Sequence, residues 1–340
     1  MSHRSQTDDH FTDKTRELLQ KMPDFVRRYI RSIHNATSAR TQYEYLKDIQ
    51  QYFRWLSQTN NTEQISLDIL KKQKKEDFED YLEYIEHYED ENQKEHRNGR
   101  KSIKRKLSSL RKFFAWLFEN EYLPSDQIRK ITIPKIAKKE IIYMEGQEIQ
   151  DFLNSIQHGK NLTKRQMDYH QQQSIRDMAI ACLMLSTGIR VSECNELDIT
   201  DIDMQQSCIH ITRKGGDEST VYFSDEAAIY IQQWLDQREN MKIHDNEKAL
   251  FLSSRKKRLA VRSIETLISK YAKRSIPGKN ITPHKLRSTY ATNLYQETGD
   301  IYLVAENLGH KDITTTKDHY AKLSDTRKQN NRNKIKLLPT

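Results

Sequence analysis

Six side chains in the C-terminal half of this 340-residue chain could act together on a phosphate ester. Guanidinium groups bind phosphate oxygens in pairs, imidazoles carry protons near neutral pH, and a phenolate can hold a phosphoryl group covalently. The set therefore predicts attack of a tyrosine on a phosphodiester, with two guanidiniums stabilising the negative charge that develops. The candidate residues are Arg190, Lys214, His284, Arg287, His310 and Tyr320.

Helix ends should position four of these residues. A glycine turn is expected to end one helix so that Arg190 opens the next, where free backbone N–H groups favour an anion. Thr282-Pro283 is typical of an N-cap and a first helical position. His284 and Arg287 are three residues apart and share a face of that helix. A glycine before His310 should end a further helix and turn the imidazole inward.

Lys214 stands in a predicted hairpin turn. Residues 208–213 and 219–223 alternate apolar and polar side chains, and they flank Lys214-Gly215-Gly216-Asp217. A lysine at such a tip could protonate a leaving oxygen, although a lysine there is often simply exposed. The register of the hairpin also leaves Arg213 as an alternative.

Composition points to nucleic acid as the partner. The chain has 57 Lys and Arg against 48 Asp and Glu, a formal net charge of +9. Nucleic acid is the leading partner class for such a basic protein, although charge alone fits a solvated basic surface equally well. No apolar run approaches the ~20 residues of a membrane span, and the first residues contain no apolar region of the kind a secretory leader has, so we do not expect secretion. Three cysteines fit no zinc pattern. No acidic cluster of metal-binding type accompanies the six residues, so a two-metal nuclease is disfavoured and no metal or cofactor is expected.

The charge is sorted along the chain. Residues 76–95 are strongly acidic, whereas residues 100–112 are basic and contain no acid, and residues 255–287 are again basic. Basic blocks separated by acidic ones suggest defined surfaces. We expect the two basic blocks to meet DNA and the acidic block to face away from it.

Apolar periodicity predicts a helical first half and a mixed second half. In the first half we expect helices and no strands, with Thr37 or Ser38 as an N-cap, at residues 12–35, 38–57, 66–72, 75–90 and 100–120. Residues 121–143 contain two prolines and a cationic stretch, as linkers do. Besides the hairpin and a last helix covering Tyr320, the second half should contain helices at 146–157, 175–186, 225–240, 261–275, 283–297 and 300–308. The fold class is mainly α with a small α+β domain.

The ordered segments TGIRVSE, ITRKGGDES, TPHKLRSTYAT and LGHKDITTT, followed by Tyr320, resemble the tyrosine recombinase (phage integrase) family. The resemblance is closest to Xer-type site-specific recombinases, especially the single-protein type of streptococci. It extends to QKMPDFVRRY and TQYEYLKDIQQYFRWL, and so covers about residues 15–325. All segments in order at family spacing are far more specific than any one of them.

The resemblance implies a C-clamp around DNA, with no membrane partner. It assigns residues 1–122 to a helical SAM-like core-binding domain, 123–143 to a linker, and 144–326 to the catalytic domain. It assigns residues 327–340 to a tail that docks on a neighbouring protomer of a homotetramer. It also implies a bacterial, cytoplasmic, nucleoid-associated protein, with a DNA translocase or directionality factor as a possible partner.

The resemblance also implies the role of each candidate. Arg190 and Arg287 hold the scissile phosphate, while Lys214 is the general acid. His284 is the general base or a phosphate ligand, and His310 is a further hydrogen-bond donor. The tyrosine forms a 3′-phosphotyrosine, and strands exchange through a Holliday junction without ATP. The DNA contacts carried over are Ser38, Arg40, Thr41, Lys101, Lys104, Arg105, Lys106, Arg111, Lys112, Arg258 and Arg262.

Two departures from the family pattern stand out. The interval from His310 to Tyr320 is ten residues where the usual pattern has nine, and His319 takes the usual place of the tyrosine. Tyr320 remains the choice because the intervening loop can absorb one residue. Asp217 stands where many relatives carry a basic residue.

Several functions stay open at the level of sequence. Xer-type chromosome dimer resolution, which serves chromosome partition and cell division, is favoured over integration or excision of a mobile element. A DNA-binding protein without cleavage activity, and a relaxing enzyme of topoisomerase type, are the alternatives of other classes.

Overall fold

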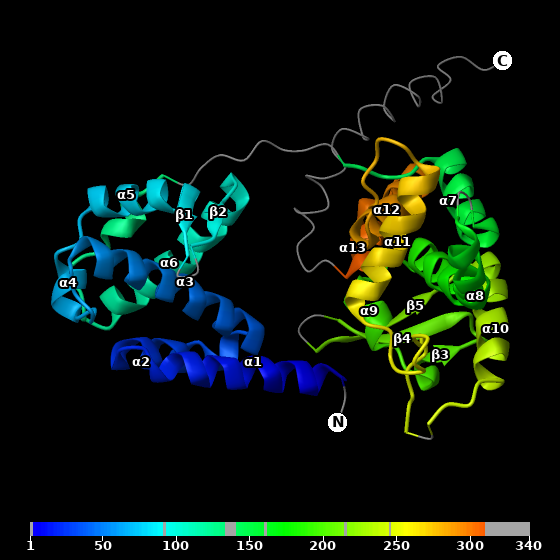
Figure 1. Cartoon of the computed structure of the whole chain (residues 1–340), viewed down its shortest axis with the longest axis horizontal. Helices are drawn as coiled ribbons and strands as arrows, with labels where there is room; N and C mark the ends of the chain where they lie inside the picture. Colours follow the sequence, from blue (N-terminus) through cyan, green and yellow to red (C-terminus); the bar gives the residue numbers. More distant parts are fainter. Residues whose placement is uncertain are drawn as a thin grey trace, which may run out of the picture. The chain divides into compact units, whose positions relative to one another are not determined.

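The computed structural model describes residues 3–90, 93–132, 141–159, 162–213, 216–244 and 246–309. Lys214, His310, Tyr320, the expected last helix and the tail 327–340 lie outside the described residues. The chain divides into two units, Met1–Lys139 and Glu140–Thr340 (Figure 1). In the described part of the chain, every helix is too short or too polar to cross a membrane.

The first unit is built mainly from helices. The expected helix at 12–35 is two helices, because Pro23 lacks a backbone N–H and disfavours helical geometry in the residue before it; Pro23 is the N-cap of the second. The helices are α1 (His3–Gln20), α2 (Asp24–Ser32), α3 (Ala39–Thr59), α4 (Leu67–Lys71), α5 (Lys75–Glu86) and α6 (Arg100–Glu119), with 3₁₀ turns η1 (His34–Ala36) and η2 (Gln127–Lys130).

The expectation that this unit has no strands, and that a helix runs to residue 90, is wrong. The chain leaves α5 at Glu86 and forms an antiparallel hairpin of β1 (His87–Glu89) and β2 (Glu95–Arg97). Tyr88 pairs with His96 across the strands, and their rings stack at 5.0 Å. Strands of three residues are too short to display a period of two, so the hydrophobic pattern could not reveal them.

Aromatic side chains fill the core of the first unit. Tyr52 on α3 is fully buried; its ring stacks on Phe78 at 5.7 Å and meets Tyr81 edge-on at 4.9 Å. Phe113 and Phe114 on α6 are buried in the same cluster. The aromatic residues at helical spacing are therefore core, as the periodicity predicts.

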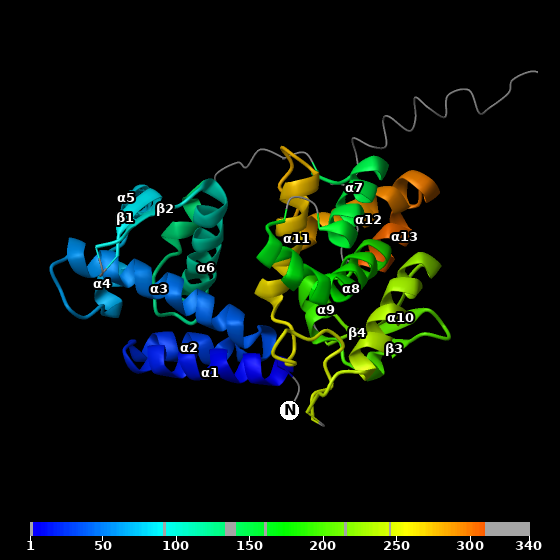
Figure 2. The ribbon, with the colours of Figure 1, turned by 45° about the vertical axis from the view of Figure 1, so that its right-hand side comes forward.

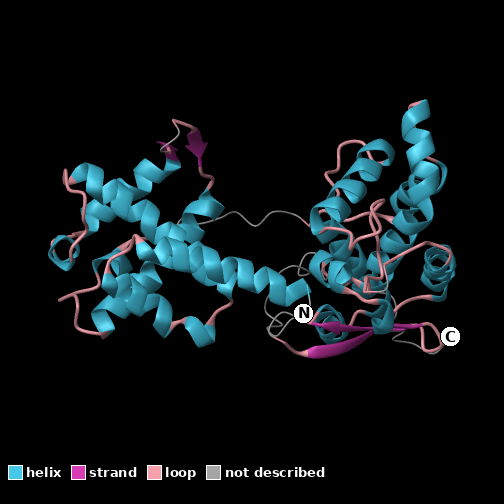
Figure 3. Ribbon diagram, turned by 60° about the horizontal axis from the view of Figure 1, so that its bottom comes forward, coloured by secondary structure: helices cyan, strands magenta, loops and turns pink. Residues whose placement is uncertain are grey.

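The second unit combines helices with one small sheet. Its helices are α7 (Gly146–His158), α8 (Lys164–Thr187), α9 (Val191–Glu196), α10 (Asp225–Glu239), α11 (Val261–Ser275), α12 (Pro283–Thr298) and α13 (Ile301–Leu308), with the 3₁₀ turn η3 (Ile199–Asp201). The strands β3 (Ile202–Asp203), β4 (Cys208–Thr212) and β5 (Glu218–Tyr222) form an antiparallel sheet in the order β3-β4-β5. Strands are magenta among the cyan helices in Figure 3.

Helix α8 is the central element of the second unit (Figure 2). It contacts α7, α9, α10, α12 and β5, and Ala179, Ile180 and Leu183 on it are fully buried. It begins at residue 164, earlier than the expected 175, because Thr163 caps it and accepts a hydrogen bond from the Gln166 N–H. Residues 164–174 are mostly polar, so apolar periodicity did not reveal this first part of the helix.

The predicted β-hairpin is confirmed. Strands β4 and β5 pair from Cys208↔Tyr222 to Thr212↔Glu218. Beyond the last pair, the Arg213 N–H donates to the carbonyl of Asp217 at 2.7 Å. This bond closes the base of the turn that contains Lys214 in the sequence.

Candidate active site

A glycine turn joins α8 to α9 and positions Arg190. Gly188 ends α8 in the left-handed conformation, with φ of 63°. A Cβ there would lie 2.3 Å from Cδ1 of Tyr290 on α12, so glycine is required by both conformation and packing. Arg190 is the N-cap of α9, as the sequence predicts.

Glu193 fixes Arg190 from within the first turn of α9. One carboxylate oxygen accepts from the backbone N–H of Arg190 at 2.7 Å, and the other accepts from its Nη1 at 2.7 Å. The Glu193 side chain is 4% exposed, whereas that of Arg190 is 34% exposed. The guanidinium is therefore oriented by a buried carboxylate and still reaches solvent, as a phosphate-binding group must.

Arg287 reaches the same turn from α12. Its guanidinium is buried and donates from Nη1 to the carbonyl of Gly188 at 2.7 Å, and from Nη2 to the carbonyl of Leu308. These bonds tie the end of α8 to the end of α13. The structure thus brings Arg190 and Arg287 to one turn, although 97 residues separate them in the chain (287 − 190).

His284 lies in the first turn of α12, with Thr282 as N-cap and Pro283 at the start of the helix, as predicted. It is exposed and borders a cavity of about 640 Å³ between α9, α11 and α12. Val191, next to Arg190 in the chain, borders the same cavity. An imidazole here could meet a ligand that also touches the start of α9.

Arg213 and Glu193 are the site residues that the sequence reasoning did not assign. Arg213 was only an alternative to Lys214, yet it is buried and donates to Glu193 at 3.4 Å and to the carbonyl of Asn307 at 2.8 Å. Burial lowers its pKa and Glu193 opposes that shift. The i, i+3 spacing of Arg190 and Glu193 was the available signal for the carboxylate.

The described part of the site is cationic. The guanidiniums of Arg190 and Arg213 both donate to the carboxylate of Glu193, and the guanidinium of Arg287 donates to the carbonyl of Gly188 in the adjoining turn. Burial raises the pKa of Tyr290, and the two buried arginines oppose that shift. A surplus of fixed positive charge is what a phosphodiester under attack requires.

The flanking residues of two undescribed candidates lie in contact. A Cβ built on Gly309 would approach Nε of Arg213 to 2.9 Å. Arg213 precedes Lys214 in the chain, and Gly309 precedes His310. The structure therefore joins the base of the hairpin to the end of α13, and the candidates Lys214, His310 and Tyr320 themselves lie outside the described residues.

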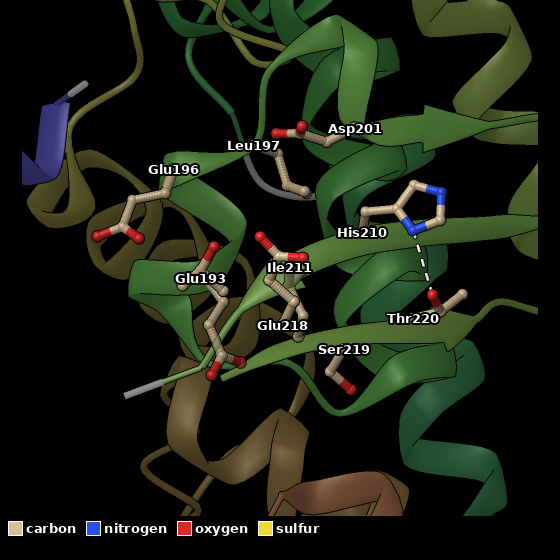
Figure 4. Close-up of a pocket in the computed structure, with 10 residues that line it drawn as sticks. Glu193, Glu196, Leu197, Asp201, His210, Ile211, Glu218, Ser219 and Thr220 are labelled. Carbon is tan, nitrogen blue, oxygen red and sulfur yellow. Dashed lines mark hydrogen bonds between the residues drawn. The ribbon is translucent and has the colours of Figure 1, made fainter. Parts of the chain in front are cut away.

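An acidic pocket lies between α9 and the strands β4 and β5 (Figure 4). It has a volume of about 380 Å³ and is lined by carboxylates of Glu193, Glu196, Asp201 and Glu218, with His210 bonded to Thr220 at 3.1 Å. Within the described ranges, no three His, Cys, Asp or Glu side chains are grouped to hold a metal ion. Carboxylates repel an anion, so this pocket does not suit a phosphate group.

The expected DNA contacts at the start of α3 are on the surface. Ser38 is exposed and caps the helix, accepting from the Thr41 N–H at 3.3 Å. The exposed Arg40 lies over the ring of Phe11 at 5.5 Å, a cation–π contact that holds its guanidinium. This end of the helix presents a hydroxyl pair and a cation to solvent.

The basic residues of α6 fall into two groups. Lys101 and Lys104 are exposed. Arg105 instead forms a bidentate pair with the buried Asp48 on α3, both distances being 2.7 Å. Lys106 bonds to Gln51 on α3, and burial lowers its pKa. Arg105 and Lys106 thus join α6 to α3.

The remaining candidates are also engaged to different degrees. Arg111 donates to the carbonyl of Ile131, and Lys112 donates to the hydroxyl of Tyr45 at 2.9 Å. In the second unit, Arg258 is largely buried and donates to the carbonyls of Asn195 and Leu197 and to the carboxylate of Asp198. Arg262 is 88% exposed and pairs with Glu265.

Two family models match the chain. One, "Phage integrase family", matches residues 143–327, and the other, "Phage integrase, N-terminal SAM-like domain", matches residues 26–121. The chain belongs to the phage integrase family. Members of this family break and rejoin DNA through a tyrosine, so the protein is a tyrosine-type site-specific DNA recombinase.

Curated relatives agree with this membership. The chain is 30% identical over 354 residues to "Tyrosine recombinase XerS" of Streptococcus agalactiae serotype III, covering 95% of this chain and 98% of that protein. It is also 30% identical over 352 residues to the protein of the same name from Streptococcus mutans. A "Tyrosine recombinase XerC" of Actinobacillus pleuropneumoniae is 32% identical over 234 residues, or 67% of this chain and 72% of that one.

Solved structures confirm the predicted fold class. An XerH site-specific recombinase bound to a palindromic difH substrate, in a post-cleavage complex, superposes with a TM-score of 0.67 at 19% identity, covering 94% of this chain and 88% of that chain. A lambda integrase dimer on a COC′ core site superposes with a TM-score of 0.61 at 17% identity, covering 86% and 95%. This phage integrase family member is thus mainly α, with small antiparallel sheets. The predicted domain boundaries remain predictions.

Proposed function

We propose that this recombinase is of the Xer type and resolves chromosome dimers, acting at duplex recombination sites. The observation that carries the proposal is the convergence of Arg190 and Arg287 on the turn at Gly188. Similarity to the XerS proteins over 95% of the chain supports the Xer assignment. The alternative of integrating a mobile element shares the same chemistry and differs in its target site.

The two arginines bind the non-bridging oxygens of the scissile phosphate. Arg190 supplies a partly exposed guanidinium held by Glu193, and Arg287 supplies a buried one held by backbone carbonyls. Because both are fixed before DNA arrives, little reorganisation opposes charge development in the transition state. This pre-organisation is the main catalytic contribution of the described residues.

The remaining steps use His284 and the three undescribed candidates. Tyr320 gives up its phenolic proton, with His284 as the general base or as a phosphate ligand, and its oxygen attacks phosphorus. The bond to the 5′-oxygen breaks, that oxygen takes a proton from Lys214, and His310 donates a hydrogen bond to the phosphate. The products are a 3′-phosphotyrosine and a free 5′-hydroxyl.

Strand exchange reverses this chemistry on a partner strand. The free 5′-hydroxyl attacks the phosphotyrosine of another protomer, so the energy of the phosphodiester bond is conserved and no ATP is needed. We propose that four protomers act two at a time through a Holliday junction. The tail 327–340 docks on a neighbouring protomer, and a DNA translocase or directionality factor controls the order of events.

We propose that cations of both units bind the DNA duplex. The exposed cations of the first unit, Arg40, Lys101 and Lys104, bind backbone phosphates, as does Arg262 of the second. Phosphate contacts set position and register and do not read sequence. Binding should therefore weaken steeply with salt.

Covalent trapping tests the proposal. Purified wild-type protein and a Tyr320→Phe variant are incubated with fragmented genomic DNA, and DNA attached to protein is isolated and sequenced. We expect wild type to yield adducts at one chromosomal site and the variant to yield none. Adducts at the ends of a mobile element would favour the integrase alternative, and absence of any wild-type adduct would contradict the proposed function.

A further inference from the structure

Arg213 is a buried cation at the base of the hairpin, on the described side of the turn. Its side chain is 7% exposed. Its Nη1 donates to a carboxylate oxygen of Glu193 at 3.4 Å, and its Nη2 donates to the carbonyl of Asn307 at 2.8 Å. A buried guanidinium stays charged and is costly to bury without such partners, so its place in the fold is strongly constrained.

The contacts of Arg213 join three separate segments. Its own backbone closes the β4–β5 turn through the carbonyl of Asp217. Its side chain reaches α9 at Glu193 and the last turn of α13 at Asn307. Gly309, with φ of 59°, lies so close that a Cβ would come within 2.9 Å of Nε.

Glu193 transmits this constraint to Arg190. The carboxylate oxygen that accepts from Arg213 also accepts from the backbone N–H of Arg190, and the other oxygen accepts from the Arg190 guanidinium. If Arg213 is removed, Glu193 loses one of the two cations that hold it, and its carboxylate can rotate. The direction in which Arg190 points then depends on a carboxylate that is no longer fixed from both sides.

We propose that Arg213 is a positioning residue for strand cleavage: by holding Glu193 against α9 and tying it to the end of α13, it orients Arg190 toward the scissile phosphate. The inference rests on the proposed role of Arg190 as a phosphate ligand. It differs from an acid role for Arg213, because its side chain is buried among protein groups and does not face the solvent.

The test compares cleavage of two linkages by full-length Arg213→Gln protein. The substrates are nicked duplexes containing the site mapped by covalent trapping, with either a normal phosphodiester or a methylphosphonate at the scissile position. The methylphosphonate replaces a charged oxygen by a methyl group, so it needs less stabilisation from Arg190. We expect single-turnover cleavage of the phosphodiester to fall about 10- to 100-fold, and cleavage of the methylphosphonate to fall several-fold less.

A matched control separates positioning from general loss of stability. Arg238 is also a buried arginine of the second unit, but it donates to the carbonyls of Ala249 and Glu247. Arg238→Gln should lower thermal stability and leave both cleavage rates within about 2-fold of wild type in the folded protein. DNA affinity should be unchanged in both variants.

Arg213→Lys keeps a cation beside Glu193. It therefore tests the inference even if the Arg213→Gln variant does not fold. Its phosphodiester rate should lie between those of wild type and Arg213→Gln, with a smaller defect on the methylphosphonate. Equal defects on both linkages, or no defect on the phosphodiester, would overturn the inference. If wild type forms no Tyr320 adduct, the proposed function fails instead, so the two failures are distinct.

Discussion

Glu193 accepts hydrogen bonds from both the backbone N–H and the guanidinium of Arg190, each at 2.7 Å. The same buried carboxylate caps α9 and also orients the side chain of Arg190, which is the N-cap residue. A local helix-capping interaction is thereby combined with the orientation of the guanidinium that we propose as a phosphate ligand. This arrangement makes the start of α9 the most informative place to perturb the site.

Replacing Glu193 by glutamine should separate charge from shape. Glu193→Gln keeps the side-chain size but leaves Arg190 and Arg213 without a buried counter-charge, which should cost about 3 kcal/mol of stability. Cleavage of a nicked site should fall by about 10- to 100-fold, with little change in DNA affinity. Glu265→Gln, which removes the partner of the exposed Arg262, is the control and should change stability by less than about 1 kcal/mol. A Glu193→Gln enzyme with wild-type cleavage would contradict the assignment.

Gly188→Ala should distort the turn that holds both arginines. Its positive φ, and the clash that an added Cβ would make with the Tyr290 ring, predict a loss of about 2 kcal/mol or more in the free energy of unfolding. Gly146→Ala in α7 is the control, because no atom lies within 4 Å of a Cβ there, and alanine should stabilise that helix by about 0.5 kcal/mol. Urea unfolding measures both; equal effects would show that the Tyr290 contact is unimportant.

Neighbouring cations of α6 should respond differently to mutation. Lys104→Ala should weaken DNA binding and reduce the slope of log affinity against log salt by about one, with stability unchanged. Arg105→Ala should cost about 3 kcal/mol of stability, because it leaves Asp48 buried without its bidentate partner. Salt titrations of DNA binding measure the first effect, and thermal unfolding measures the second. A normal salt slope for Lys104→Ala would remove it from the DNA contacts.

The cysteines should be unreactive in the native protein. Burial raises the pKa of the Cys182 and Cys194 thiols to about 12, and it also raises the pKa of Cys208. Since the thiolate is the reactive form, labelling by a disulfide reagent at pH 8 should be slow and should follow unfolding. The measurement is thiol release with and without urea. Rapid labelling of folded protein would show that at least one thiol reaches solvent.

Short sequence signals predicted several ends of helices and strands correctly. The glycine before Arg190, the Thr282-Pro283 pair and the glycines of the hairpin predicted element ends that the structure confirms. These succeeded because capping and turn formation depend on a few adjacent residues. The break at Pro23 and the short β1–β2 hairpin were missed, since a pattern spanning several turns could not resolve a single proline or three-residue strands.

By itself the sequence determined which residues could do the chemistry, their order, and the helix ends on which Arg190 and Arg287 stand. Only the tertiary structure decided which cations remain exposed and which support the fold from within. Arg105 and Arg213 look like other basic residues in the sequence, yet Arg105 pairs with the buried Asp48 on α3, and Arg213 is itself buried and pairs with the buried Glu193 on α9. The physical reason is that a charge becomes structural when packing removes its water, and packing depends on residues distant in the chain.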